Sequence, residues 1–252
     1  MSFVDPVDVQ REEIRPAVAA GEQKIRKLFS RASRVLAAGE VLVPEGSSHD
    51  YVYRMRSGWT ARARTISDGR TQYILTFLPG DLFAVKSMFV REHPDRIEAL
   101  SNAVVEQIDR RELMRAYKED SDIAMRCTWQ VVEEERRLHN WVVGLGRGSV
   151  QERIASLILQ FRSRLALAGV IAIDALTFDV PMTQQQLADH LGVSLVHFNK
   201  SLRRIRDAGA LAVHGRTFEM LDWPALVAMA EPVLDPMEAS SEHFTGSAAR
   251  AK

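Results

Sequence analysis

The sequence predicts an α+β fold: an N-terminal antiparallel β-roll of the double-stranded β-helix or jelly-roll type, a long dimerisation helix, and a C-terminal winged helix-turn-helix. Three observations lead to this prediction. Turn residues punctuate residues 36–112 at roughly ten-residue intervals, as in antiparallel barrels and rolls. Apolar residues recur at near-heptad spacing within residues 113–145, and residues 182–211 contain two capped amphipathic helices around a glycine. We expect residues 1–35 to be a helical lead-in, 146–234 the winged domain and 235–252 a disordered tail.

Composition and cysteine content limit the class of protein. The chain has 252 residues, 46% of them hydrophobic, so it can form one large or two ordinary domains with real cores. Its single cysteine, Cys127, excludes an internal disulfide and any multi-cysteine zinc or iron–sulfur site built from one chain. No apolar run approaches the ~18 residues of a membrane span, and the first residues lack the pattern of a signal peptide. We therefore expect a soluble, cytoplasmic protein with no metal, no cofactor and no membrane partner.

Short β-rich segments lie between the turns of residues 36–112. Residues 51–55 and 71–77 are rich in β-branched and aromatic side chains, and residues 94–109 continue the pattern. The turns fall at residues 38–40, 45–46, 57–58, 68–69 and 79–81, and each contains a glycine. This regular alternation predicts antiparallel strands that close into a barrel or roll.

Residues 113–145 are expected to form a helix that pairs two copies of the chain. The seam has spacings of four, four, three, four, three and four residues, close to the heptad of a coiled coil. Its predicted dimer-interface residues are Ile123, Cys127, Val131, Leu138, Trp141 and Leu145. Glu134 also lies on the seam, which is unfavourable unless its carboxylate is paired or partly hydrated. The alternative is a helix packed on its own roll.

A glycine-rich segment follows this helix. Gly144, Gly146 and Gly148 predict a flexible hinge before a second domain. Residues 149–168 then carry one apolar stripe and predict another amphipathic helix.

Residues 182–211 predict two helices joined by a tight turn. Thr183 followed by Gln186 is a capping-box pattern at the start of the first helix, and Ser194 can cap the second. Gly192 suits the left-handed conformation that ends the first helix. Residues 210–213 and 216–221 are typical of two short strands and would form a wing. The second helix of such a motif enters the major groove of DNA.

Charge favours DNA binding over the many helix pairs that never contact DNA. Residues 182–216 carry five Lys or Arg and two Asp, a local charge of +3 on a chain whose formal net charge is zero. A local basic patch suits a site-specific binder better than a protein that coats nucleic acid without specificity. The predicted DNA-contacting residues are Thr183, Gln184, Gln185, Ser194, Leu195, Val196, His197, Asn199, Lys200, Arg203 and Arg216.

The order of these parts resembles the Crp/Fnr family of bacterial transcription regulators. The resemblance extends over about residues 36–230, and it rests on an ordered set of short motifs with matching spacing. These are Gly39-Glu40, Glu45-Gly46, Ser57-Gly58, residues 68–70, 77–83 and 98–100, Arg153-Ile154 and residues 187–194. The resemblance implies a homodimer that binds a pseudo-palindromic site in double-stranded DNA. It favours activation of transcription, and we also expect RNA polymerase as a partner.

The first departure from the family concerns the ligand. Cyclic-nucleotide-binding members follow Gly-Glu-Leu with an Arg-Ser-Ala or Arg-Thr-Ala element, whose arginine neutralises the cyclic phosphate. This chain has GDL at residues 80–82, but VREHPD at residues 90–95 replaces the arginine element. Because an anion buried without a cation is expensive, we do not expect dependence on cyclic AMP unless Arg91, His93 or Arg96 substitutes.

The second departure concerns iron. Oxygen-sensing members hold an iron–sulfur cluster with several cysteines near the N-terminus, and this chain has none there. Packing on the apolar seam explains Cys127 better than a redox switch does. Isolated histidines are weak evidence for haem ligation; the candidates are His49, His93 and His139.

Two alternatives are open for the interior of the roll: a pocket for an unknown small-molecule effector, or a filled, effector-independent core. The predicted pocket residues are Phe83, Ala84, Lys86 and Ser87, together with Leu138 from the helix.

The third departure lies in the second helix of the motif. Many members place Arg and Glu near its start and Arg four residues after the Glu, whereas this chain has Leu195, Val196 and Lys200. Leucine and valine cannot hydrogen-bond base edges but can contact a thymine methyl group. Asn199 can bind adenine, and Lys200 or His197 can donate to guanine. The operator is therefore expected to differ from the usual half-site of the family.

Two other classes of function are compatible with parts of the sequence. A ligand sensor whose winged helix serves protein contacts would show no salt-dependent binding to duplex DNA. An enzyme is disfavoured, because the sequence has no nucleophile elbow, no metal-spaced His/Glu pair and no phosphate-cradling glycine loop.

Overall fold

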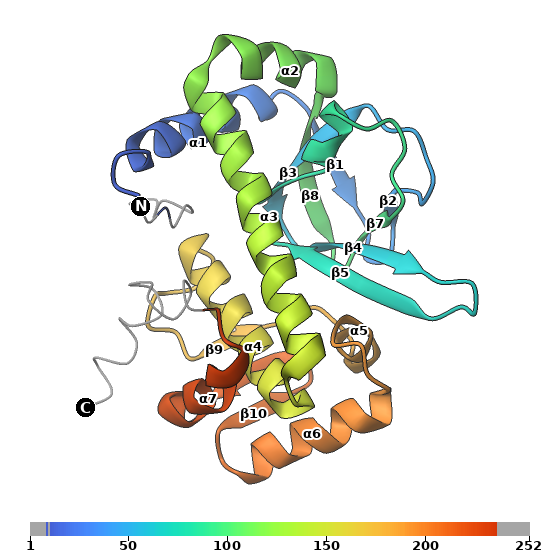
Figure 1. Cartoon of the computed structure of the whole chain (residues 1–252), viewed down its shortest axis with the longest axis vertical. Helices are drawn as coiled ribbons and strands as arrows, with labels where there is room; N and C mark the ends of the chain where they lie inside the picture. The colour runs from blue at the N-terminus through green and yellow to red at the C-terminus, as the bar shows by residue number, and fades with distance from the viewer. Residues whose placement is uncertain (1–8, 10, 236–252) are drawn as a thin grey trace. The chain divides into compact units, whose positions relative to one another are not determined.

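The computed structural model describes residue 9 and residues 11–235 (Figure 1). The chain divides into two compact units, and the division falls between Arg137 and Leu138, inside one long helix. The first unit contains the strands of the predicted roll, and the second contains the predicted winged helix-turn-helix. The tail predicted at residues 235–252 lies, apart from Asp235, outside the described residues. In the described part of the chain, no helix is both long and apolar enough to cross a membrane.

The roll consists of two four-stranded antiparallel sheets within the described residues. One has the order β1 (Ser33–Leu36), β8 (Ala103–Asp109), β3 (Tyr51–Ser57) and β6 (Leu82–Phe83). The other has the order β2 (Val41–Val43), β7 (Arg96–Ala99), β4 (Thr60–Thr65) and β5 (Thr71–Phe77). Most neighbours are far apart in the chain, as in the pairing of β1 with β8 and of β2 with β7, so the chain folds back along itself. The predicted β-roll is confirmed.

Helices accompany the roll before and after its strands. They are α1 (Arg15–Phe29), the short 3-10 helix η1 (Val85–Met88), α2 (Arg110–Glu119) and α3 (Ser121–Arg147). The structure differs from the uninterrupted helix predicted from residue 113, because Asp120 separates α2 from α3 with an extended backbone (φ −131°, ψ 110°). The Asp120 carboxylate accepts hydrogen bonds from the backbone N–H groups of Asp122 and Ile123, at 3.0 and 3.3 Å. Asp120 thus caps the start of α3 and ends the continuity of the helix.

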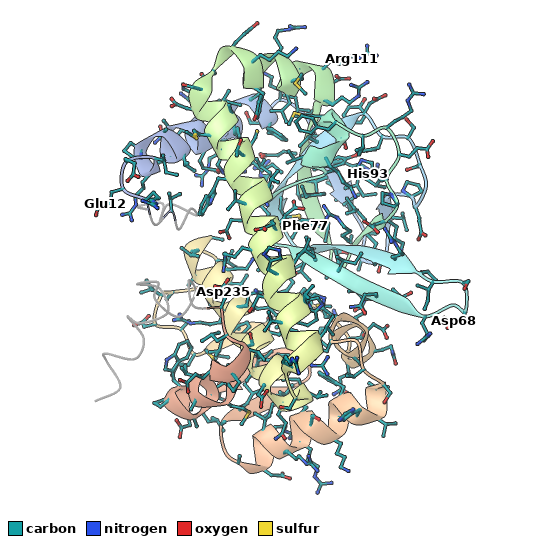
Figure 2. The ribbon with its side chains drawn as sticks, in the orientation of Figure 1. Glu12, Asp68, Phe77, His93, Arg111 and Asp235 are labelled. Carbon is teal, nitrogen blue, oxygen red and sulfur yellow. The ribbon has the colours of Figure 1, made fainter. Side chains whose placement is uncertain are left out.

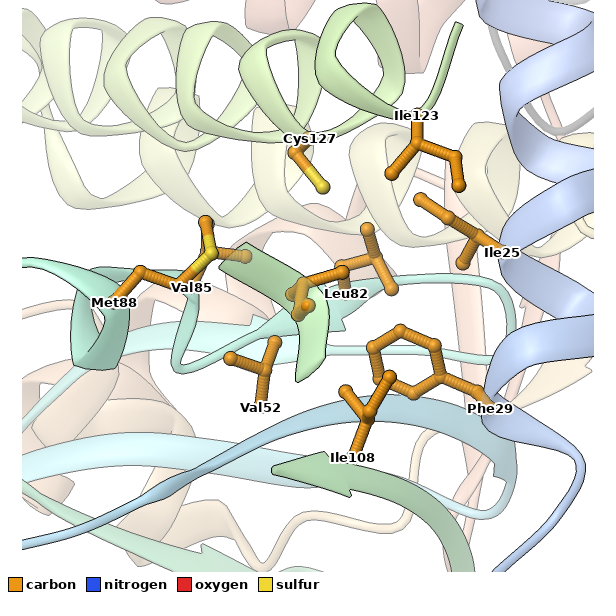
Figure 3. Close-up of a cluster of buried hydrophobic side chains, with 10 residues drawn as sticks. Ile25, Phe29, Val52, Leu82, Val85, Met88, Ile108, Ile123 and Cys127 are labelled. Atoms are coloured by element: carbon orange, nitrogen blue, oxygen red, sulfur yellow. The ribbon is translucent and has the colours of Figure 1, made fainter. Parts of the chain in front are cut away.

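One hydrophobic cluster holds the helices to the sheets (Figure 3). Ile25 and Phe29 of α1 and Ile123 and Cys127 of α3 face Val52, Leu82 and Ile108 of the strands. Ile123 is 7% exposed and Cys127 is 1% exposed. The first turns of α3 therefore pack on their own roll, as in the alternative reading of the seam.

Helix α1 approaches α3 closely at Gly21. A Cβ atom at this position would lie 2.1 Å from the backbone oxygen of Asp122. The two helices run past each other at one end of the roll (Figure 1). The predicted lead-in is thus helical from Arg15 and forms part of the core of the first unit.

A buried polar cluster also joins α1 to β3 and α3. Glu22 is 3% exposed, and its carboxylate accepts hydrogen bonds from Arg54 at 3.0 Å and Arg126 at 2.8 Å. Arg54 also donates to Glu106 at 3.0 Å. Burial alone would raise the pKa of Glu22, but the charges of Arg126 and Arg54 outweigh it and lower that pKa.

The second unit is built on α4 (Val150–Leu167), which packs against α6 and α7. Its other elements are β9 (Thr177–Asp179), α5 (Gln184–His190), α6 (Leu195–Asp207), β10 (Leu211–His214), β11 (Thr217–Met220), α7 (Trp223–Ala230) and the 3-10 helix η2 (Glu231–Val233). The strands form one antiparallel sheet in the order β10, β11, β9. The predicted winged helix-turn-helix is confirmed, and β9 is a third strand that the sequence pattern did not indicate. Helix α3 continues through Gly144 and Gly146 of the predicted hinge.

Candidate nucleic-acid interface and effector pocket

Local hydrogen bonds define the turn between α5 and α6. The Thr183 hydroxyl accepts from the Gln186 backbone N–H at 3.1 Å, and the Gln186 side chain accepts from the Thr183 N–H at 2.8 Å. Gly192 has a φ of +63°, the left-handed conformation that glycine adopts without a Cβ clash. The Ser194 hydroxyl then accepts from the His197 N–H at 3.3 Å and caps α6. The capping box and both predicted caps are present.

Helix α6 separates an apolar face from a polar one. Phe198, Leu202 and Ile205 are at most 4% exposed and pack into the unit. The predicted DNA-contacting side chains of His197, Asn199, Lys200 and Arg203 are exposed on the rest of the helix, and so is Val196; Leu195 is half-buried. This arrangement presents donors, an amide and an apolar group on one exposed surface, which is what base recognition requires.

A hollow of about 500 Å³ lies beside α6, and its charged lining is two arginines and Asp207, which lies 3.6 Å from Arg203. Gln184 from the start of α5 lines it together with Asn199, Arg203 and Arg206 of α6. Leu202 and Leu211 supply apolar lining. The fold thus brings Gln184 next to the second helix. It also adds Arg206, which lies on the polar face of that helix but is not among the predicted contacts. Two guanidinium groups beside an amide suit contacts to phosphate oxygens.

The wing is held by its sheet. Leu211 to His214 pair with Thr217 to Met220, and β11 pairs with β9 on its other side. The Thr217 hydroxyl donates to Asp179 at 2.6 Å, and the Val180 N–H donates to the Arg216 carbonyl at 2.9 Å. The exposed side chain of Arg216 therefore projects from an anchored turn.

Two contacts that the sequence pattern did not indicate support the first helix of the motif. Trp141 stacks on His190 of α5 with ring centroids 4.6 Å apart. Arg153 of α4 donates to the carbonyl of Leu191, at the end of α5, at 2.7 Å. Arg153 lies within a mostly apolar helix at 8% exposure, so a polar residue at a core position and its place in the Arg153-Ile154 motif were the signals in the sequence.

In the roll, the predicted pocket residues adjoin a stack of aromatic rings. Phe83 is fully buried and stacks on Tyr53 at 5.3 Å and on Phe77 at 4.9 Å. Tyr53 stacks in turn on His49 at 5.2 Å. Ala84 follows with a φ of 58° and is the one non-glycine residue with a positive φ in the described chain. It is the N-cap residue of η1, which begins directly after β6. Leu138 belongs to the other compact unit.

Charged groups inside the roll are paired with one another. Lys86 lies 3.4 Å from the carboxylate of Asp95, which also binds Arg64 at 2.7 Å. Arg62 pairs with Glu134 of α3 at 2.9 Å, so Glu134 is paired within the roll. Burial, followed by the charge of Arg62, lowers the pKa of Lys86. Each of these cations already has an acidic partner.

The residues proposed to replace a phosphate-binding arginine differ in their surroundings. His93 is fully buried, and its Nε2 lies 2.8 Å from the Ser87 hydroxyl (His93 and Phe77 are labelled in Figure 2). Arg96 binds Glu98 at 2.6 Å, whereas Arg91 is exposed. Burial, followed by the charge of Lys86, lowers the pKa of His93 to about 4.

Acid is expected to destabilise the protein through His93. Its pKa in the fold lies below the ordinary histidine value, so its contribution to stability is complete above pH 6.5 and is lost as the pH falls toward 4. At pH 5 the loss should reach about 2 kcal/mol. Urea unfolding at pH 7.5 and 5.0 measures it, with His93→Gln as the comparison. An equal loss in both proteins would contradict the assignment.

Among the described residues, no group of three or more His, Cys, Asp or Glu side chains could hold a metal ion. Cys127 lies in the core, and burial raises the pKa of its thiol to about 11.

Two family models match this chain in the order of its two units. Residues 33–120 match the cyclic nucleotide-binding domain, and residues 152–229 match the Crp-like helix-turn-helix domain. The chain belongs to the Crp/Fnr family of transcription regulators. As a Crp/Fnr regulator it is a DNA-binding protein and not an enzyme. Residues 152–229, which include α5, α6 and the wing, form its helix-turn-helix DNA-binding domain.

Relatives of this Crp/Fnr regulator cover most of its length. The nitrogen fixation regulation protein FixK of Bradyrhizobium diazoefficiens is 28% identical over 192 residues, which is 76% of this chain and 78% of FixK. The transcriptional activator protein FnrL of Cereibacter sphaeroides is 23% identical over 184 residues, 73% of each chain. The structure of FixK2 from Bradyrhizobium japonicum matches with a TM-score of 0.71 at 25% identity, covering 79% of this chain and 96% of that one.

Proposed function

We propose that the protein acts as a homodimer that binds a pseudo-palindromic operator in the cytoplasm. Each winged domain would read one half-site, with half-site centres about 34–36 Å apart, one turn of DNA. The observation that carries the proposal is the exposed polar and basic surface of α6, set on a capped helix whose other face is buried. FnrL is described as a transcriptional activator, and we infer activation through contact with RNA polymerase here too.

The side chains divide into two groups by what they can bind. His197, Asn199 and Lys200 are exposed near the start of α6 and would contact base edges in the major groove. Phosphate contacts would come from the residues at the periphery of the surface. These are Thr183, Gln184, Gln185, Ser194, Arg203 and Arg216.

The exposed face of α3 supports a dimer. Val131, Val142 and Leu145 are 51%, 67% and 44% exposed, although they are apolar. They lie on one heptad-spaced seam, formed by Thr128, Val131, Glu135, Leu138, Val142 and Leu145. Of the other predicted interface residues, Ile123 and Cys127 pack in the roll and Trp141 stacks on His190. We therefore place the dimer contact on the exposed seam, which shares Val131, Leu138 and Leu145 with the predicted one.

We further propose that DNA binding requires neither cyclic AMP nor an iron–sulfur cluster. The pairing of Arg62 with Glu134 and of Lys86 with Asp95 leaves a cyclic phosphate without an unpaired cation among these residues. The stacked rings of Tyr53, Phe77 and Phe83 occupy the neighbouring core. If another small molecule acts on the roll, it must bind the DNA-competent arrangement more tightly than the alternative.

Selection on a randomised duplex library tests the proposal. Purified protein with no added ligand should enrich a two-fold symmetric motif. Binding should weaken steeply with salt, because phosphate contacts release counterions. Enrichment only after addition of cyclic AMP would overturn effector independence, and no salt-dependent binding under any condition would favour a role in protein contacts.

Base reading and phosphate contact should respond differently to mutation. Lys200→Ala should weaken operator binding by about 1–3 kcal/mol and relax the preference at one base pair. Arg216→Ala should weaken binding to all sequences alike and reduce the salt slope by about one. Titrations with operator and random duplex at several salt concentrations separate the two effects. An unchanged motif in Lys200→Ala would show that Lys200 reads no base.

A further inference from the structure

One apolar side chain lies among the polar groups on the exposed surface of α6. Val196 is 79% exposed, more than any other large hydrophobic side chain among the described residues. It lies in the first turn of α6, immediately after the Ser194 cap. Asn199 and Lys200 follow three and four residues later, so they adjoin Val196 on the helix surface. A single exposed valine is ordinary; its position between base-reading side chains is what makes it informative.

Valine restricts what this position can recognise. It has no hydrogen-bonding group, so it cannot accept a bond from the amino group of cytosine or donate to guanine. The apolar feature of a base edge in the major groove is the 5-methyl group of thymine. The β-branched side chain is stiff about χ1, which costs little entropy when a methyl group packs against it. Neighbouring Leu195 is half-buried and less available.

From this juxtaposition we infer that Val196 is the specificity-determining contact for the 5-methyl group of a pyrimidine beside the base pairs read by Asn199 and Lys200. The inference rests on the proposed function and deepens it. It predicts a thymine at one fixed position of each half-site. It also predicts that 5-methylcytosine, which carries the same methyl group at the same place, is bound better there than cytosine.

Base analogues test the methyl group alone. In the selected operator, each thymine is replaced in turn by deoxyuridine, which differs only by the missing methyl group. At one position the affinity should fall about fourfold per half-site, and about 16-fold when both half-sites are changed, as expected for the loss of one buried carbon group. Replacing cytosine by 5-methylcytosine in a thymine-to-cytosine operator should recover a similar factor.

Protein variants assign the effect to Val196. In Val196→Ala, whose shorter side chain covers less of the methyl group, the ratio between thymine and deoxyuridine at that position should fall toward one. In the matched variant Leu195→Ala, the fourfold ratio should remain. Because Val196 is exposed, Val196→Ala should unfold at the same denaturant concentration as the wild type. A ratio that persists in Val196→Ala, or the absence of any thymine with this response, would overturn the inference. Failure to bind any duplex would instead overturn the proposed function.

Discussion

Glu22→Ala is expected to lower the free energy of unfolding by about 3–5 kcal/mol, the cost of removing one partner from a buried ion pair. Glu22 is 3% exposed and is bound by Arg26, Arg54 and Arg126, which come from α1, β3 and α3. Arg126 is 3% exposed and Arg54 is 8% exposed, so both would remain buried with less compensation for their charge. The loss should therefore loosen α1 and α3 from the roll together.

An exposed ion pair provides the control for this experiment. Arg31 and Glu112 also lie 2.9 Å apart, but their side chains are 69% and 44% exposed. Glu112→Ala should change stability by under about 1 kcal/mol, because solvent screens such pairs. Urea unfolding at pH 7 measures both variants. Equal small losses would show that the Glu22 cluster contributes no more than a surface pair.

The lowered pKa of Glu22 adds a dependence on acid. A carboxyl group whose pKa falls on folding stabilises the protein fully above its unfolded value of 4.5 and loses that contribution as the pH falls below it. The difference in stability between the wild type and Glu22→Gln should therefore shrink in acid below pH 4.5.

Val142→Glu is expected to dissociate the dimer. Val142 is 67% exposed on the proposed seam, so the substitution leaves the fold of one chain intact. In a symmetric dimer it would place two like charges close together, which costs several kcal/mol and should raise the dissociation constant at least about 100-fold. Operator affinity should fall as well, because a single chain has only one winged domain and can contact only one half-site.

Sedimentation across a concentration series measures the change. Val170→Glu is the matched control, since Val170 is 50% exposed and lies after α4, outside the proposed seam. It should leave both the dimer and operator binding unchanged. A Val142→Glu protein that sediments like the control would place the dimer contact elsewhere.

The recognition motif was predictable because its determinants are local. Thr183 with Gln186, Gly192 and Ser194 act within three or four residues of themselves, so the sequence pattern specifies their caps and turn without reference to the rest of the chain. Strands β2 to β5 of the roll were predictable for a similar reason, since each lies between two glycine turns. Strand β9 was not, because three residues on a sheet edge carry too short a pattern.

The long helix shows where local pattern fails. An apolar residue at heptad spacing can face either a second chain or its own domain, and the sequence treats the two alike. Ile123 and Cys127 pack into the roll, whereas Val131 and Val142 are exposed on the neighbouring face of the helix. The heptad spacing of the apolar residues is visible in the sequence, but the partner of each residue depends on which surface the sheet presents.

By itself, the sequence determined the fold class, the winged motif, the residues of its polar face and the departures at Val196 and at residues 90–95, because periodicity, caps and turns are properties of neighbouring residues. Only the tertiary structure decided how the charges pair. Arg62 and Glu134 are 72 residues apart, and Glu22 and Arg126 are 104 apart. No local pattern encodes such contacts, because they form only when closure of the roll brings distant elements together and burial makes an unpaired charge costly.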